Sequence, residues 1–188
     1  MNYEEIIKKA RELAYLESGK SVRPLFELAN KNGQKLAEKL GADKDIVMLG
    51  TLLMDLKLKQ AMKDGKINEH VKMSLDATKQ FLQGFELDKE IRNKIYNSVE
   101  AHHGNIPFES LEAEICANAD CYKFLHPEGV LRYIGILSGE RGEDFEDVLN
   151  QVEYKMDEKW NILSLDICKK ELEPYYRQFK ELISRARE

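Results

Sequence analysis

Apolar residues recur along this chain at intervals of three and four, which is the spacing of one face of an α-helix. The clearest stripe lies within residues 22–40, and Gly41 then ends the pattern. No segment of convincing length alternates apolar and polar residues as a half-buried strand does. Glycines, prolines and short polar stretches separate the periodic segments. The pattern predicts helices at residues 2–17, 22–40, 43–62, 67–83, 88–103, 110–126, 129–138 and 143–186.

Two of these segments are unusual. Residues 143–186 are too long for one helix of a globular protein, so we expect a break near residues 163–166 or before Pro174, which suits a first helical turn. Residues 46–54 are almost entirely apolar and are expected to form a central helix, against which each neighbour packs one stripe. The pattern therefore predicts an all-α bundle in which residues 1–188 form a single domain.

The composition is that of a folded, globular chain. Of 188 residues, 43% are hydrophobic and 34% are charged, which excludes a disordered protein. The net charge of −5 argues against a nucleic-acid-binding surface, which would show clustered lysine and arginine. Three cysteines, an odd number without CxxC spacing, are expected to be buried free thiols.

No segment has the length of a membrane span. The longest nearly unbroken apolar run, residues 46–54, is shorter than the roughly 20 residues that a membrane crossing needs. The first twenty residues are charged and amphipathic and lack the features of a signal peptide. We therefore expect a cytoplasmic protein with no membrane partner.

Candidate chemistry gathers in a few histidines and aspartates. The adjacent pair His102 and His103 closes the apolar stripe of the helix predicted at 88–103, and His70 stands near the start of another helix. Asp55 interrupts the apolar run TLLMDLKL, and Asp120 lies on an apolar stripe. An unpaired buried carboxylate costs several kcal/mol, so each aspartate requires a cationic partner.

Two kinds of partner fit these aspartates. One is a buried ion pair or a helix cap made with Arg23, Arg132, Lys57 or Lys123. The other is a metal ion, because aspartates and imidazoles on separate helices form a mixed nitrogen and oxygen site that suits Zn, Fe, Mn or Mg. A carboxylate can bridge two cations, which together polarise a phosphoryl oxygen and generate hydroxide near neutral pH.

The order of these residues resembles the HD-domain metal-dependent phosphohydrolases. The resemblance covers a core at about 20–135, and a C-terminal helical extension at about 143–188 is similar to the tail of small members. The matching segments are LAEKLGAD (36–43) with IVMLGTLLMDL (46–56), Glu69-His70 with Ser74, AHHG (101–104), LEAEICANAD (111–120), and Gly129 with Arg132.

This resemblance implies an all-α HD-domain-like helical bundle and hydrolysis of phosphate mono- or diesters, often of nucleotides, at one or two divalent metal ions. Asp55 would be the shared carboxylate and Asp120 the distal one, acting as a ligand or as the base that orients water. His70 and one of His102 and His103 would be the imidazole ligands. Phosphate contacts are expected from Lys57, Lys59 and Arg132.

The chain also departs from the family pattern. Met54-Asp55 stands where the family has its His-Asp doublet, and no histidine precedes His70, although the family's first histidine is expected near residues 21–25. Three hypotheses follow. The protein is a hydrolase with a reduced metal site, or a catalytically impaired HD module that binds a nucleotide, a metal or a protein partner without turnover, or a helical domain whose histidines and aspartates serve only core hydrogen bonds, with no metal.

Overall fold

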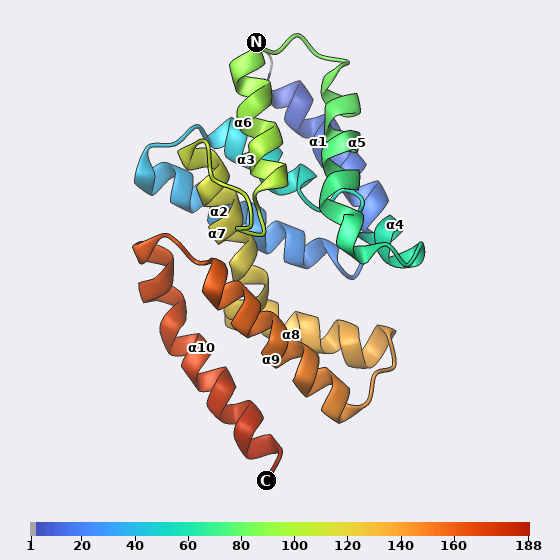
Figure 1. Cartoon of the computed structure of the whole chain (residues 1–188), viewed down its shortest axis with the longest axis vertical. Helices are drawn as coiled ribbons and strands as arrows, with labels where there is room; N and C mark the ends of the chain where they lie inside the picture. Colours follow the sequence, from blue (N-terminus) through green and yellow to red (C-terminus); the bar gives the residue numbers. More distant parts are fainter. Residues whose placement is uncertain (1–2) are drawn as a thin grey trace.

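The computed structural model describes residues 3–188, which form a bundle of helices joined by short turns (Figure 1). This part of the chain contains no strand, which confirms the all-α prediction. Asn2, the predicted start of the first helix, lies outside the described residues. The helices are α1 (Tyr3–Ser18), α2 (Arg23–Leu40), α3 (Lys44–Leu53), α4 (Leu58–Lys63), α5 (His70–Leu82), α6 (Lys89–Glu100), α7 (Leu111–Leu125), α8 (Pro127–Gly135), α9 (Phe145–Ile162) and α10 (Asp166–Ala186). A short 3-10 helix, Ile67–Glu69, precedes α5, and a π-helical turn, Ile136–Glu140, follows α8.

Local signals define the helix pair that leads to the centre of the molecule. Helix α2 ends at Gly41, whose φ of 74° is the left-handed conformation that glycine adopts at little cost. Helix α3 then begins at Asp43, whose carboxylate accepts hydrogen bonds from the backbone N–H groups of Asp45 and Ile46. This turn therefore directs the apolar residues of α3 into the core.

The hydrophobic core has two parts. One joins α1, α3, α5 and α6, and the other joins α2 with α7, α8, α9 and α10. In Figure 1 the first group lies toward the top and the gold-to-red helices α8, α9 and α10 toward the bottom. Helix α3 contacts α1, α2, α5, α6 and α7, and of its residues 46–53 all but Met48 are buried, which confirms the predicted central helix.

Two predicted helices are wrong at the positions that matter most for chemistry. The helix predicted at 43–62 is interrupted, because residues 54–57 form a turn closed by the Leu58 N–H bonding to the Asp55 carbonyl at 3.0 Å. The helix predicted at 88–103 ends at Glu100, and Gly104 turns the chain with a φ of 69°. Asp55, His102 and His103 therefore lie in turns, where side chains can converge from several directions.

The C-terminal segment breaks between α9 and α10, as predicted for residues 163–166. The buried side chain of Asn118 on α7 holds this break, since its amide oxygen accepts the backbone N–H groups of Ser164 and Leu165 at 3.2 and 3.1 Å. The alternative break before Pro174 is wrong, because Pro174 lies inside α10.

Other expectations from the sequence concern the cysteines and the membrane. All three cysteines are buried and free, and burial raises the pKa of the Cys116 thiol to about 12 and that of Cys168 to about 11. None of the helices within residues 3–188 is both long and apolar enough to cross a membrane.

Candidate functional site

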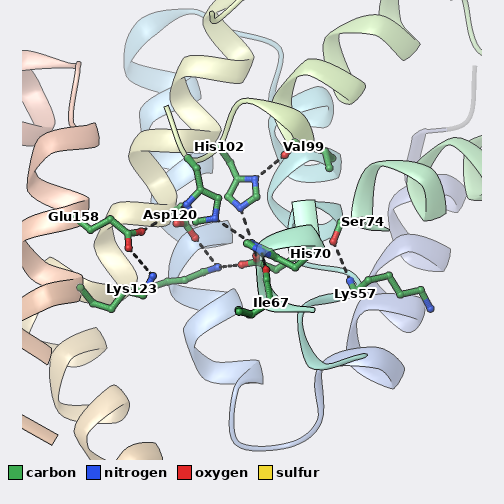
Figure 2. A network of polar contacts seen from close by, with 12 residues as sticks. Lys57, Ile67, His70, Ser74, Val99, His102, Asp120, Lys123 and Glu158 are labelled. Atoms are coloured by element: carbon green, nitrogen blue, oxygen red, sulfur yellow. Dashed lines mark hydrogen bonds and ion pairs between the residues drawn. The ribbon is translucent and has the colours of Figure 1, made fainter. Parts of the chain in front are cut away.

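Three imidazoles form one cluster, and two of them, His70 and His102, are labelled in Figure 2. His70 is the first residue of α5, and His102 and His103 lie in the turn that follows α6. One ring nitrogen of each histidine lies within 4.8 Å of the other two, and the Nε2 atoms of His70 and His103 are 3.1 Å apart. The His102 side chain is 1% exposed and that of His70 is 12% exposed, so the cluster is largely shielded from water.

Backbone carbonyls fix the orientation of two of these rings. Nδ1 of His70 lies 2.6 Å from the carbonyl oxygen of Ile67, and Nδ1 of His102 lies 2.6 Å from that of Val99. A carbonyl only accepts, so each Nδ1 carries a proton, and the neutral form of each ring has its lone pair on Nε2. The Nε2 atom of His102 is buried and has no hydrogen-bond partner among residues 3–188. Histidines that ligate metals are usually held by their second nitrogen in this way.

Asp55 stands between the histidines and a lysine. Its Oδ1 lies 3.5 Å from Nε2 of His102 and 3.8 Å from Nε2 of His70. Its Oδ2 forms an ion pair with Nζ of Lys123 at 2.7 Å. The two oxygens of this carboxylate therefore face two different environments, an imidazole cluster and an ammonium group.

Asp120 is enclosed by lysines. Nζ of Lys123 lies 2.7 Å from its Oδ1, and Nζ of Lys159 lies 2.7 Å from its Oδ2. Lys159 also approaches Nδ1 of His103 at 3.5 Å and Oε1 of Glu158 at 3.6 Å. Asp120, Lys123 and Lys159 are all buried, so both oxygens of Asp120 are engaged by ammonium groups in a low-dielectric setting.

The electrostatics keep these buried groups charged. Burial alone would raise the pKa of Asp55 and Asp120, but Lys123 and His102 at Asp55, and Lys123 and Lys159 at Asp120, together outweigh burial and hold both pKa values well below the ordinary range. Burial likewise opposes the charge on Lys123, yet the two carboxylates raise its pKa. Burial lowers the pKa of His103, which favours the neutral ring that a metal ion requires.

The cationic partner of the aspartates is one of the four that the sequence suggested. Lys123 contacts both carboxylates, whereas Lys57 pairs with Glu17 at 2.8 Å and Arg132 pairs with Glu128 at 3.0 Å. Arg23 instead donates to the backbone carbonyl of Tyr15 and lies over that ring.

Sequence analysis missed two residues of the site, Lys159 and Glu158. A signal for Lys159 was available, because the buried stripe of α9 runs through Val148, Val152 and Met156, and Lys159 continues it three residues later. A lysine at a core position requires a buried anion. Glu158 is half-exposed and gives no comparable signal.

Cavities adjoin the cluster. A cavity of about 260 Å³ is lined by Asp55, His70, His103, Asp120 and Lys159, among others. It shares Asp55, Phe124, Tyr133 and Arg141 with a neighbouring cavity of about 350 Å³, which is otherwise lined mostly by apolar residues and by Lys20, Lys59 and Lys123. A more open groove of about 540 Å³ reaches His70 and His103 beside Tyr154 and Lys155. Lys57 and Arg132 line none of these three cavities.

The side chains around the cluster fit a metal ion beside the three histidines, but they do not fit one between Asp55 and Asp120. Three imidazole nitrogens and Oδ1 of Asp55 form a nitrogen-rich set that suits Zn, Fe or Mn. The space between Asp55 and Asp120 does not fit a metal ion, because the ammonium group of Lys123 already lies within 2.7 Å of both carboxylates.

Solved structures with the same architecture carry sequences that have diverged far from this one. Bacillus subtilis YpgQ superimposes with a TM-score of 0.68 at 17% identity, covering 99% of this chain and 96% of that one. An HD-superfamily hydrolase of Bacillus thuringiensis gives 0.67 at 17% identity, covering 97% and 93%. A predicted HD-superfamily hydrolase from an uncultured Thermotogales bacterium gives 0.58 at 17% identity, covering 82% and 84%. The fold matches that of HD-domain structures.

The likeness is established in the fold, whereas searches with the whole sequence do not find it. The chain matches no protein-family model, and no curated protein matches its sequence. The all-α HD-like architecture expected from the sequence is therefore established by the arrangement of the helices, and the histidine cluster lies within that architecture as a candidate metal site.

Proposed function

We propose that this protein is a metal-dependent phosphohydrolase that acts on a phosphate ester or nucleotide with a single divalent ion. The observation that carries the proposal is the buried Nε2 of His102, which has no hydrogen-bond partner in the described part of the chain and lies 3.5 Å from a carboxylate oxygen of Asp55. Together with His70 and His103, these groups form an inward-facing ligand set beside a cavity, in a fold shared with HD-superfamily hydrolases.

The proposed ligands are His70, His102, His103 and Oδ1 of Asp55. A divalent ion bound there would supply a Lewis acid for a phosphoryl oxygen and would lower the pKa of bound water. The chain's own contribution is orientation, since the carbonyls of Ile67 and Val99 hold two rings with Nε2 directed inward. Lys123 holds the other oxygen of Asp55, so this carboxylate is fixed before any ligand arrives.

The cavities support a small phosphorylated molecule as substrate. Lys59 and Arg141 line the larger cavity and can contact phosphate, while Phe26 and Phe124 offer apolar surface to an organic group or a base. We place the phosphate contacts on Lys59 and Arg141. Lys57 and Arg132, also expected from the sequence, are engaged elsewhere.

A second candidate function is a binding module without turnover. The observation that favours it is the enclosure of Asp120 by two lysines, which leaves neither of its oxygens free to orient water or to hold a second ion. In this case a nucleotide or similar anion would occupy the same cavities, and its phosphate would not be cleaved.

Metal content and turnover together test these functions. We expect purified protein to hold about one equivalent of a transition metal, and the His102→Ala variant to lose it. His126→Ala is the matched control, because His126 caps α8 and takes no part in the cluster.

Hydrolysis across a panel of nucleotides and phosphate esters supports the enzyme. Thermal stabilisation by a nucleotide without hydrolysis supports the binding module. Absence of metal after incubation with Zn²⁺, Mn²⁺ and Fe²⁺ contradicts the metal-dependent enzyme.

A further inference from the structure

Lys123 occupies an unusual position between two carboxylates of different helical segments. Its Nζ lies 2.7 Å from Oδ2 of Asp55, in the turn after α3, and 2.7 Å from Oδ1 of Asp120 on α7. Its side chain is only 3% exposed. Figure 2 shows the Lys123 side chain beside Asp120 at the centre of the network.

The carboxylate of Asp55 thus has the arrangement of a bridging ligand. One oxygen faces the imidazole nitrogens of His70 and His102, and the other faces an ammonium group. A carboxylate that joins two cations in this way is typical of two-metal hydrolytic sites. Here one of the two cation positions is filled by a side chain of the chain itself.

We propose that the Lys123 ammonium is a built-in cation that takes the place of a metal ion between Asp55 and Asp120, so that the centre has one exchangeable cation position instead of two. The remaining position, at the histidines, rests on the proposed function. The replacement at the aspartates does not, because it depends only on the two contacts of Lys123.

The two oxygens of Asp55 therefore face cation positions with different chemical properties. The ammonium group neutralises two buried carboxylates and orients Asp55, but it binds no water as a Lewis acid and cannot lower the pKa of a nucleophile. Lys123 is therefore a positioning residue, and Asp120 serves to hold it. This assignment predicts that removing the ammonium creates a metal site, which an ordinary structural ion pair would not do.

The test is the number of divalent ions bound by the Lys123→Ala variant. Wild type and variant are stripped with a chelator, and binding of Mn²⁺ is measured by equilibrium dialysis and electron paramagnetic resonance. Lys155→Ala is the matched control, since it removes the same charge from α9 beside the site, where within residues 3–188 the ion-pair partner of Lys155 is Glu158. We expect the Lys123 variant to bind one more Mn²⁺ than wild type, and the control to bind the same number as wild type.

Each outcome decides the proposal. If the folded Lys123→Ala variant binds no more Mn²⁺ than wild type, or if the Lys155 control gains the same ion, the proposal is wrong. If the variant is unfolded without metal, its circular dichroism is followed during Mn²⁺ addition. Folding on addition supports replacement of the ammonium by the metal, and a failure to fold at every concentration overturns it. A wild-type count of zero contradicts the proposed function alone, because the expected increment of one remains measurable.

Discussion

Nε2 of His102 lies 3.5 Å from Oδ1 of Asp55, and within residues 3–188 this buried nitrogen has no hydrogen-bond partner. Nδ1 of His102 lies 2.6 Å from the carbonyl oxygen of Val99 and donates to it, so Nε2 carries the lone pair whenever the ring is neutral. In that form a lone pair and a carboxylate oxygen face each other inside the protein. Leaving such acceptors unsatisfied is costly, and a cation between them removes that cost.

The two aspartates should respond differently to neutralisation. We expect Asp55→Asn to weaken binding of Zn²⁺ or Mn²⁺ by about 10-fold or more, because an oxygen beside the histidines loses its charge. Asp120→Asn should change this affinity much less, since both of its oxygens contact lysines. Isothermal titration calorimetry measures both. Equal losses in the two variants would show that Asp120 is itself a ligand.

Phosphate contacts should come from Arg141 and not from Arg132, the arginine that the sequence resemblance suggested. Arg141 lines the larger cavity, whereas Arg132 pairs with Glu128 outside it. With a substrate that the protein hydrolyses, or a nucleotide that it binds, Arg141→Ala should raise KM or Kd by about 10-fold, which corresponds to about 1.4 kcal/mol. Arg132→Ala should leave the constant unchanged, and the reverse result would place the anion elsewhere.

The buried lysines and aspartates should stabilise one another, so that their contributions to the free energy of unfolding are not additive. Lys159→Met removes one of the two cations around Asp120, and breaking a buried pair from one side costs about 3–5 kcal/mol. Because Lys123 remains on Asp120, we expect a loss near the lower limit. The double variant Lys159→Met/Asp120→Asn should lose less than the sum of the single variants.

Urea denaturation gives these free energies of unfolding. The exposed pair of Lys72 and Asp76 on α5 provides the comparison, because its partners lie in water, and Lys72→Met should barely change stability. Additive losses at Lys159 and Asp120 would mean that the two groups do not stabilise one another.

Glu112 should make stability depend on pH away from the site. Burial alone would raise the pKa of its carboxyl, but backbone N–H groups, including that of Asp43 at 3.2 Å, and the nearby Lys94 lower it. A lowered pKa stabilises the fold above the ordinary value of about 4.3, and this contribution is lost as the pH falls through the folded-state pKa.

The difference in urea midpoint between wild type and Glu112→Gln should therefore be largest near pH 7 and should shrink in acid. A difference that grows as the pH falls would contradict the expected sign.

Asn118 should be essential for the turn between α9 and α10. Its amide oxygen accepts two backbone N–H groups, and its amide nitrogen donates to Oγ of Ser164 at 2.8 Å. Asn118→Ala leaves these groups without their partner, so we expect a loss of about 2–4 kcal/mol in the free energy of unfolding. Asn68→Ala, at an exposed position, is the control. A small effect at Asn118 would mean that water replaces the amide.

The sequence determined the class of fold through spacing alone. Apolar residues at intervals of three and four predicted the helices and the central position of residues 46–54, because the side that a helix buries is determined by the spacing of apolar residues within that helix. The same information identified the histidines and Asp55 as candidates, and it included Lys123 among the possible partners of the aspartates.

Tertiary structure decided where the helices stop at the site. Periodicity continues through Asp55 and through His102, yet both lie in turns. The local pattern contains no reason for the break at Asp55, whose contacts come from residues 15, 47 and 68 positions farther along the chain.

Only the tertiary structure also showed which lysines neutralise each aspartate. Lys123 is three residues from Asp120, so one helical turn already places the two together, but its second contact with Asp55 requires α7 to pack beside the end of α3. Lys159 comes from another helix and meets Asp120 only when α9 covers α7. The sequence supplied the charged groups, and packing decided which charges neutralise one another, because Coulomb energy in a buried site depends on distances that only the folded chain fixes.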